Sequence, residues 1–298
     1  MQDFDSMLNV AAIPQDEKKA AFVSESRENR ARCYEMSEQM TEEVATNAET
    51  FRQYLDTQSR FDRYTANNLL LIMAQRPDAQ RLGDYGYWRD QGAFVRRSER
   101  RNPVLIMEPG KEYERDDGSI GQYYNAKKVY DITQTNMRVQ EEPEQKIEDR
   151  TLIRALVNNP PVAIESTDPE DMPVYDKGAL FVPEDGKIYV RTGMDAQDIF
   201  QSLTPELLLA QIAKGNRDFN RDEYAFHAYC ASYILCRKCG VETGRYDFTH
   251  APEQFEGLEP QEVRSELSVI RNAASEVSAR MAKVLDFGKN HRTQEQAR

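Results

Sequence analysis

The chain has 298 residues, of which 39% are hydrophobic and 30% charged, and its formal net charge is −12. This length is sufficient for two domains of ordinary size, and the composition is that of a folded protein rather than a disordered one. No apolar run approaches the roughly 18 residues of a membrane span, and the start MQDFDSMLNV lacks the basic and apolar stretches of a secretion signal. The sequence therefore predicts a cytoplasmic protein with no membrane partner.

The first part of the chain predicts a flexible N-terminus over residues 1–27 and a unit of helices and a small sheet over residues 28–139. Helical composition gives way after Gly83 to short apolar runs separated by turn residues, which is typical of strands. The expected elements are helices over 28–56 and 65–74, strands over 104–107 and 129–132, and a turn at Asp117–Gly118.

A polar, acidic linker is expected over residues 140–150, because QEEPEQKIE combines acidic residues with a proline. Residues 151–298 then form the second domain. A hairpin is predicted from two apolar runs joined through Glu184-Asp185-Gly186. The expected elements are strands over 179–183 and 187–191 and helices over 148–157, 195–203, 206–214, 222–239 and 260–287.

The four cysteines fit a reducing compartment. Three of them, with His227, fall in one predicted helix. At about 100° per residue, His227 and Cys230 lie on one side of this helix, while Cys236 and Cys239 lie roughly opposite. Four ligands on different sides of a helix cannot form a tetrahedral zinc site, so the cysteines are predicted to be buried structural thiols.

A basic, aromatic segment stands out in this acidic chain. Residues 58–101 contain nine arginines against five acidic residues. Aromatic rings can stack on unpaired bases, and guanidinium groups can contact phosphates, which is the chemistry of single-strand binding. The alternative is a solvated basic face whose charges pair with the acidic second half. The rings in question are Tyr85, Tyr87, Trp88 and Phe94, and the nearby cations include Arg96, Arg97, Arg100 and Arg101.

The segment from Tyr64 to Pro109 resembles the N-terminal domain of ArdC-type antirestriction proteins of plasmids and conjugative transposons. The shared pattern is a Tyr-Thr-x-x-Asn helix start, Gln-x-Pro, an aromatic–Trp pair and a basic turn before a strand. Tyr130-Asp131-Ile132-Thr133-Gln134-Thr135 resembles a further strand motif of the family, and Ser98 replaces the usual turn glycine. The matching positions are Tyr64, Asn68, Gln75, Pro77, Trp88, Gly92, Val95, Arg96 and Pro109.

The resemblance implies a domain that binds single-stranded DNA without sequence preference. For individual residues, alternatives remain open: a lone tryptophan such as Trp88 is often a core residue, and Asn68 could contact a base or bridge backbone groups. The predicted strand contacts are Tyr64, Asn68, Trp88, Arg89, Arg96, Arg97, Arg100 and Arg101.

The second half resembles a zincin-type metallopeptidase domain that lacks its zinc ligands. Such domains carry His-Glu-x-x-His on a helix, with the histidines as ligands and the glutamate as general base. Here Glu206 takes the place of the base, but Pro205 and Leu209 replace the histidines, and Tyr229 takes the place of the third ligand. Thr204 can instead cap a helix that begins at Pro205. No metal or cofactor is expected.

The sequence thus predicts an α+β protein: a helix-plus-small-sheet domain followed by a zincin-like, mainly helical domain with a β-hairpin. The favoured function is non-catalytic, namely binding and protecting single-stranded DNA during conjugative transfer of a mobile genetic element. One alternative is an acidic scaffold or DNA mimic that binds a protein of a restriction or conjugation system. A less favoured alternative is an active metallopeptidase that uses Glu206 and an unforeseen ligand set including His227.

Overall fold

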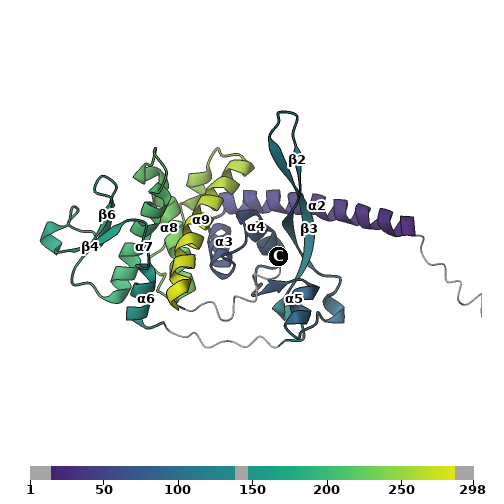
Figure 1. Ribbon diagram of the computed structural model, residues 1–298, viewed down its shortest axis with the longest axis horizontal. Helices are drawn as coiled ribbons and strands as arrows, with labels where there is room; N and C mark the ends of the chain where they lie inside the picture. The colour runs from purple at the N-terminus through teal and green to yellow at the C-terminus, as the bar shows by residue number, and fades with distance from the viewer. Residues whose placement is uncertain (1–14, 138–146, 286–298) are drawn as a thin grey trace, which may run out of the picture.

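The computed structural model describes residues 15–137 and 147–285, which form an α+β fold with two small sheets (Figure 1). The predicted fold class is confirmed at this level. None of the helices in these two ranges is long and apolar enough to cross a membrane. The first range contains helices α2 (Gln15–Thr46), α3 (Ala48–Arg60), α4 (Ala66–Gln75) and α5 (Tyr85–Asp90), strands β1 (Leu82–Gly83), β2 (Val104–Glu114) and β3 (Ile120–Asp131), and 3₁₀ turns η1 (Arg97–Glu99) and η2 (Ile132–Gln134).

The second range contains a three-stranded sheet and four α-helices. The expected hairpin is present as β5 and β6, and β4, which the sequence did not predict, pairs in parallel with β6. The elements are α6 (Asp149–Leu156), β4 (Ala163–Thr167), η3 (Pro169–Asp171), β5 (Ala179–Val182), β6 (Lys187–Arg191), α7 (Ala196–Ala213), α8 (Arg221–Cys239), η4 (Ala251–Phe255) and α9 (Pro260–Leu285).

The N-terminal helices differ from the prediction at two points. Helix α2 already begins at Gln15, so residues 15–27 are helical, and the expected flexible N-terminus is wrong for this stretch. Its apolar residues follow no clear helical stripe, which is why the sequence pattern did not reveal it. The single helix expected over 28–56 is instead divided at Asn47, whose side chain accepts a hydrogen bond from Thr50 N (2.9 Å) and caps α3. Residues 1–14 lie outside the described ranges.

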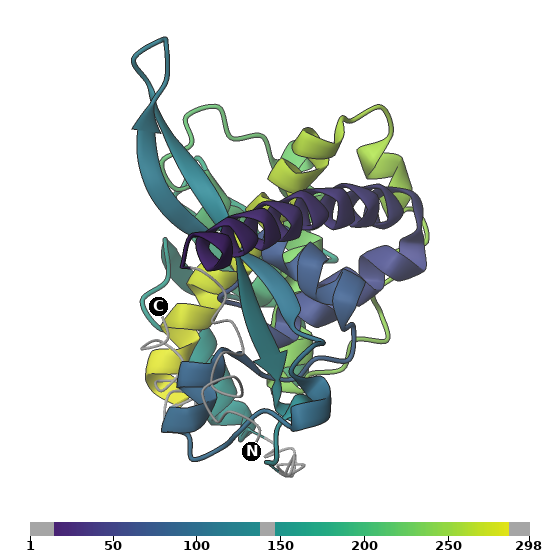
Figure 2. The same ribbon diagram turned by 90° about the vertical axis from the view of Figure 1, so that its right-hand side faces the viewer.

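Strands β2 and β3 form a long antiparallel hairpin that projects beyond the helices, and α2 runs across it (Figure 2). The predicted turn at Asp117–Gly118 is confirmed at its tip, where Gly118 has φ +80°, a conformation that glycine adopts without strain. The strand order of this sheet is β1-β3-β2, so β2 is an edge strand.

The two halves share one hydrophobic core. Phe51 and Leu55 of α3 and Leu69 of α4 belong to the same buried cluster as Leu207 of α7 and Leu235 of α8. The predicted linker over 140–150 lies largely outside the described residues, but Ile147 packs against this core and α6 begins at Asp149. Within the described ranges, the predicted domains therefore do not have separate cores.

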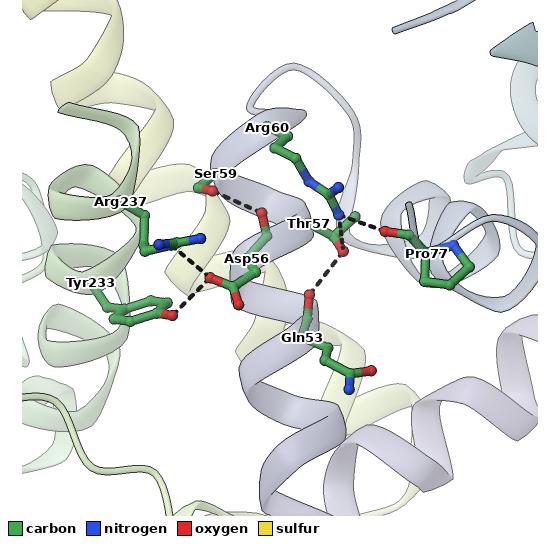
Figure 3. A network of polar contacts seen from close by, with 8 residues as sticks. All are labelled: Gln53, Asp56, Thr57, Ser59, Arg60, Pro77, Tyr233 and Arg237. Carbon is green, nitrogen blue, oxygen red and sulfur yellow. Dashed lines mark hydrogen bonds and ion pairs between the residues drawn. The ribbon is translucent and has the colours of Figure 1, made fainter. Parts of the chain in front are cut away.

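A polar network also joins the halves, between α3 and α8 (Figure 3). The carboxylate of Asp56 accepts a hydrogen bond from Tyr233 Oη (2.7 Å) and forms an ion pair with Arg237 Nε (2.9 Å). On the other side of α3, Arg60 donates to the carbonyl of Pro77 (2.7 Å) and to Thr57 Oγ1 (3.2 Å). These contacts fix α3 between α8 and the turn that follows α4.

A second charged cluster makes the fold sensitive to acid. Asp62 accepts hydrogen bonds from Lys238 Nζ and from Ser278 Oγ (3.2 Å), which connects the end of α3 to α8 and α9. Burial alone would raise the pKa of Asp62, but Lys238, Ser278 and Arg63 outweigh it and lower the pKa below the ordinary value. The cluster therefore stabilises the fold when Asp62 is ionised.

We expect this stabilisation to be complete above the unfolded-state pKa of about 3.9 and to be lost as pH falls through the lower folded-state pKa. Urea unfolding at pH 5, 4, 3 and 2 should show that wild type and Asp62→Asn converge in stability as pH falls. Asp176→Asn, at an exposed position, is the control and should keep a constant offset from wild type. A constant difference between wild type and Asp62→Asn would contradict the assignment.

Candidate nucleic-acid interface

A basic groove of about 660 Å³ lies where α2, the end of α4 and the start of the β2–β3 hairpin meet. Among the described residues, its one acidic lining residue is Glu25, which pairs with Lys128 at 2.5 Å. Arg76 is partly held by a hydrogen bond to Thr133 Oγ1 (3.2 Å). The groove thus concentrates positive charge on a chain whose net charge is −12. The lining cations are Arg32, Arg76, Arg100, Arg101 and Lys128.

The loop that carries Arg100 and Arg101 is held by the motif that follows β3. Gln134 Nε2 donates to the carbonyl of Asn102 (2.7 Å) and to Glu99 Oε2 (3.1 Å), and the Gln134 carbonyl accepts from Arg96 N (2.9 Å). The hydroxyl of Tyr130 donates to the carbonyl of Arg100 (3.0 Å). These bonds fix the backbone of the loop, so that its two exposed arginine side chains are presented from a rigid support.

Asp131 in turn fixes this motif. It is fully buried, and its Oδ1 accepts from the backbone N–H groups of Gln80 (2.7 Å) and Arg81 (2.8 Å). Its Oδ2 accepts from Thr133 N (3.0 Å) and Thr133 Oγ1 (2.6 Å), and Gln134 Oε1 accepts from Asp131 N, which completes a capping box. The Tyr-Asp-Ile-Thr-Gln-Thr motif is therefore the framework of the basic loop.

Asn68 and Gln75 have an equivalent structural role on α4. Asn68 Nδ2 donates to the Met107 carbonyl and its Oδ1 accepts from Met107 N, both at 2.8 Å. Gln75 makes the same pair of bonds with Leu105, at 2.8 and 2.9 Å. The two amides satisfy the free backbone groups of the edge strand β2, as a neighbouring strand would. The predicted contact of Asn68 with DNA is corrected, because its amide is buried and already bonded to Met107.

Trp88 is also part of the framework. Its side chain is fully buried in a small cluster with Tyr87, Val95, Tyr130 and Ile132, and its Nε1 donates to the Tyr130 carbonyl (2.9 Å). A ring without exposed surface cannot stack on a base, so the predicted contact of Trp88 with DNA is corrected in favour of the core alternative. The exposed rings of the segment are Tyr85 and Phe94.

The remaining predicted contacts lie in several places. Tyr64 is half-buried against Phe61, and burial raises the pKa of its hydroxyl to about 12. Arg96 donates to the carbonyl of Thr133. Arg89 and Arg97 are exposed outside the groove lining.

Of the predicted arginines, the structure brings Arg100 and Arg101 into the groove. It adds Arg32 and Lys128, which sequence reasoning missed, and Arg76, which was noted only as part of the local charge excess. The spacing of residues along α2 and their alternation along β3 do not predict that Arg32 and Lys128 lie close together. The contact between Lys128 and Glu25 joins elements about 100 residues apart in the sequence.

The predicted zincin positions lie in a well-packed helix. Helix α7 runs unbroken through Pro205, so the alternative that a helix begins at this proline is wrong. Thr204 Oγ1 donates to the carbonyl of Phe200 (2.5 Å) rather than capping a helix start. Pro205 has no N–H to donate to the carbonyl of Gln201, and that carbonyl instead accepts from Arg245. These two side contacts accommodate the proline inside the helix.

Glu206 is a buried structural carboxylate. Its Oε1 pairs with Arg221 Nη2 (2.5 Å) and its Oε2 accepts from Phe181 N (2.7 Å), while Arg221 Nη1 donates to the Phe181 carbonyl (3.1 Å). The pair therefore ties α7 and the start of α8 to strand β5. Both oxygens of Glu206 are occupied by protein donors.

The other positions of this region are likewise part of the packing. Leu209 is buried, and Tyr229 Oη accepts from Asp247 N (2.7 Å). His227 Nε2 lies 2.5 Å from Glu266 Oε2. Over residues 15–137 and 147–285, no three His, Cys, Asp or Glu side chains are grouped so that they could hold a metal ion.

The cysteines are free thiols and all are buried, as predicted. Burial raises the pKa of Cys33 to about 11 and that of Cys239 to about 12. Thiols with such pKa values remain protonated and unreactive near neutral pH.

Comparison with known proteins shows what the first part of the chain is. Residues 31–155 match the family model described as the N-terminal domain of anti-restriction factor ArdC. No curated protein matches the sequence. Among solved structures, the chain is similar to the metal-free antirestriction ArdC protein from the R388 plasmid, with 15% identity and a TM-score of 0.45, over 74% of this chain and 86% of that chain. It is also similar to the Mn(II)-bound structure of that protein, with 16% identity and a TM-score of 0.44, over 77% of this chain and 98% of that chain.

All five cations of the basic groove fall inside the matched range. Residues 31–155 are therefore an ArdC-type N-terminal domain.

Proposed function

We propose that this protein binds single-stranded DNA in its basic groove and acts without catalysis, as an antirestriction-type protein that protects or handles DNA during conjugative transfer. The observation that carries the proposal is the convergence of five cations on one groove. Cations spaced along a groove contact successive phosphates and do not depend on base sequence. The description of the matching family model, the N-terminal domain of anti-restriction factor ArdC, supports the antirestriction setting.

The ring of Tyr85 favours a single strand over a duplex. It is 48% exposed and packs 4.8 Å from the ring of Tyr130, whose hydroxyl holds the backbone of Arg100. An exposed ring is thus positioned beside the basic loop. A duplex keeps the faces of its bases stacked inside, whereas the bases of a single strand can stack on such a ring. Each base stacked on an aromatic side chain stabilises the complex by about 1–3 kcal/mol.

The non-catalytic part of the proposal follows from the chemistry at the zincin positions. Pro205 and Leu209 offer no metal donor, and the carboxylate of Glu206 is neutralised by Arg221. Both oxygens of this carboxylate are bonded to protein donors, one to the Arg221 guanidinium and the other to the backbone N–H of Phe181.

We expect Arg100→Gln/Arg101→Gln to weaken binding of labelled oligo-dT by about tenfold or more at ~50 mM salt, because each exposed guanidinium contacts a phosphate. The slope of log affinity against log salt should also fall by about 0.7 per lost contact. Fluorescence anisotropy over a series of salt concentrations measures both quantities.

Lys214→Gln/Arg217→Gln is the matched control, since it removes two positive charges from exposed positions in the second half of the chain. It should leave affinity within about twofold of wild type. Failure of the wild type to bind at ~50 mM salt, or an equal loss in both variants, would rule out the groove as the binding site.

A further inference from the structure

A second groove, of about 860 Å³, lies between the C-terminal half of α2 and the segment from η4 to the start of α9. Helix α2 contributes Glu38, Thr41, Glu42, Ala45 and Thr46. This spacing of three and four residues places all five on one face of the helix. The stretch is about 12 Å long at 1.5 Å per residue, which corresponds to two helical turns.

The opposite wall supplies apolar surface. Phe255 and Val263 are buried at the base of the groove, and Leu258 is 37% exposed in it. Pro252 and Pro260 complete this wall. A partner that occupies the groove would cover this apolar surface, and its burial would stabilise the complex.

The rim of the groove is acidic. Four exposed glutamates line it, and within residues 15–137 and 147–285 no lysine or arginine is among the lining residues. Two basic groups lie close by: His250 Nδ1 is 2.6 Å from Glu253 Oε1, and Arg264 Nη1 donates to Thr41 Oγ1 (3.3 Å). The four glutamates are Glu38, Glu42, Glu253 and Glu256.

We propose that this groove is a docking site for a cationic amphipathic helix of a protein partner. Apolar side chains of the partner at i, i+3 or i+4, and i+7 would cover the floor over two turns, and its lysines or arginines would face the glutamates. Nucleic acid and anionic lipid surfaces are repelled by the same rim.

The two grooves divide α2 between two ligands of opposite charge. Glu25, Asn29, Arg32 and Met36 line the basic groove, whereas the acidic groove begins at Glu38. DNA and a cationic protein would therefore be directed to different halves of one helix. The docking site does not depend on DNA binding, and either one can fail without the other.

The test is the affinity of a fluorescein-labelled peptide of 14 residues, with leucine at helical i, i+3/i+4, i+7 spacing and lysine elsewhere. We expect Glu38→Gln/Glu42→Gln to weaken its binding at least fivefold. Leu258→Asn, which removes apolar surface at an exposed position, should also weaken it. A scrambled peptide of the same composition should bind the wild type at least fivefold more weakly, because it cannot cover the floor.

Glu112→Gln/Glu114→Gln is the matched control, with the same charge change at exposed positions of the hairpin. It should bind the peptide within twofold of wild type. If Glu38→Gln/Glu42→Gln and the control bound the peptide equally well, or if the wild type bound both peptides equally well, the proposal would be wrong. Either result would mean that the acidic chain attracts lysine without a defined site.

Two further results would assign the groove to a different occupant. If Lys289→Gln/Arg292→Gln/Arg298→Gln strengthened peptide binding more than fivefold, the basic C-terminal segment of this chain would be the occupant. If the wild type sedimented as a dimer and Glu38→Gln/Glu42→Gln sedimented as a monomer, a second copy of this chain would be the occupant. Either result would overturn the assignment to a separate protein partner.

Discussion

Trp88→Ala is expected to lower the free energy of unfolding by about 3–5 kcal/mol, the usual range for removing a fully buried tryptophan. The side chain has no exposed surface, and its Nε1 donates to the Tyr130 carbonyl at 2.9 Å. Truncation leaves both a cavity in the cluster with Tyr87 and Val95 and a buried carbonyl without its donor. Urea unfolding followed by circular dichroism measures the loss, because the variant lacks the single tryptophan of the chain.

Trp88→Phe separates the packing of the ring from a role in DNA binding. It keeps most of the aromatic volume but loses the hydrogen bond, so the expected loss is smaller, about 1–3 kcal/mol. Folded Trp88→Phe should bind oligo-dT with wild-type affinity, because the ring is buried. A stable variant with strongly reduced affinity would show that this ring contacts the strand after all.

Glu206→Ala is expected to destabilise the protein by about 2–4 kcal/mol. Removing one member of a buried ion pair typically costs about 3–5 kcal/mol, and the 29% exposure of the Arg221 side chain reduces this because its charge can be partly rehydrated. The N–H of Phe181 also loses its acceptor. Urea unfolding of the variant at neutral pH measures this effect.

Glu206→Gln is the informative companion variant. Its amide oxygen can still accept from Phe181 N, so it should be more stable than the alanine variant while it loses the charge interaction with Arg221. If Glu206 were instead a peptidase base, the glutamine variant would fold normally and lose proteolysis. Wild type purified without chelator would then also contain about one equivalent of transition metal by elemental analysis.

Trp88 is one of several residues that the ArdC-type pattern singles out and that the fold uses as framework. Trp88, Asn68 and Asp131 all bond to backbone groups rather than projecting into a groove. Their bonds place β2, β3 and the loop before β2, and this loop presents Arg100 and Arg101. These residues therefore hold the backbone of the interface in place. The cations that would contact DNA come from this loop and also from α2 and β3.

Local sequence patterns were sufficient for most of the elements. The turn residues of Asp117–Gly118 and Glu184-Asp185-Gly186 predicted both hairpins, and helices were also predicted at the positions of α4, α8 and α9. The same reasoning failed at α7, because a proline normally ends a helix and the bond from Arg245 to the freed carbonyl of Gln201 is not visible in the local sequence. It also missed β4, whose residues alternate weakly and pair with residues of β6 that lie 24 positions further along the chain.

The sequence by itself determined that this is an α+β chain with an ArdC-type first part, with buried thiols and with arginine enriched over residues 58–101. Those properties depend on composition and on neighbours within a few residues. Only the tertiary structure decided which polar side chains are free to act: Asn68 is bonded to a strand 39 residues away, while Arg32 and Lys128 meet Arg100 and Arg101 in one groove. The reason is physical, since the availability of a polar group depends on whether burial has already paired it with a distant partner.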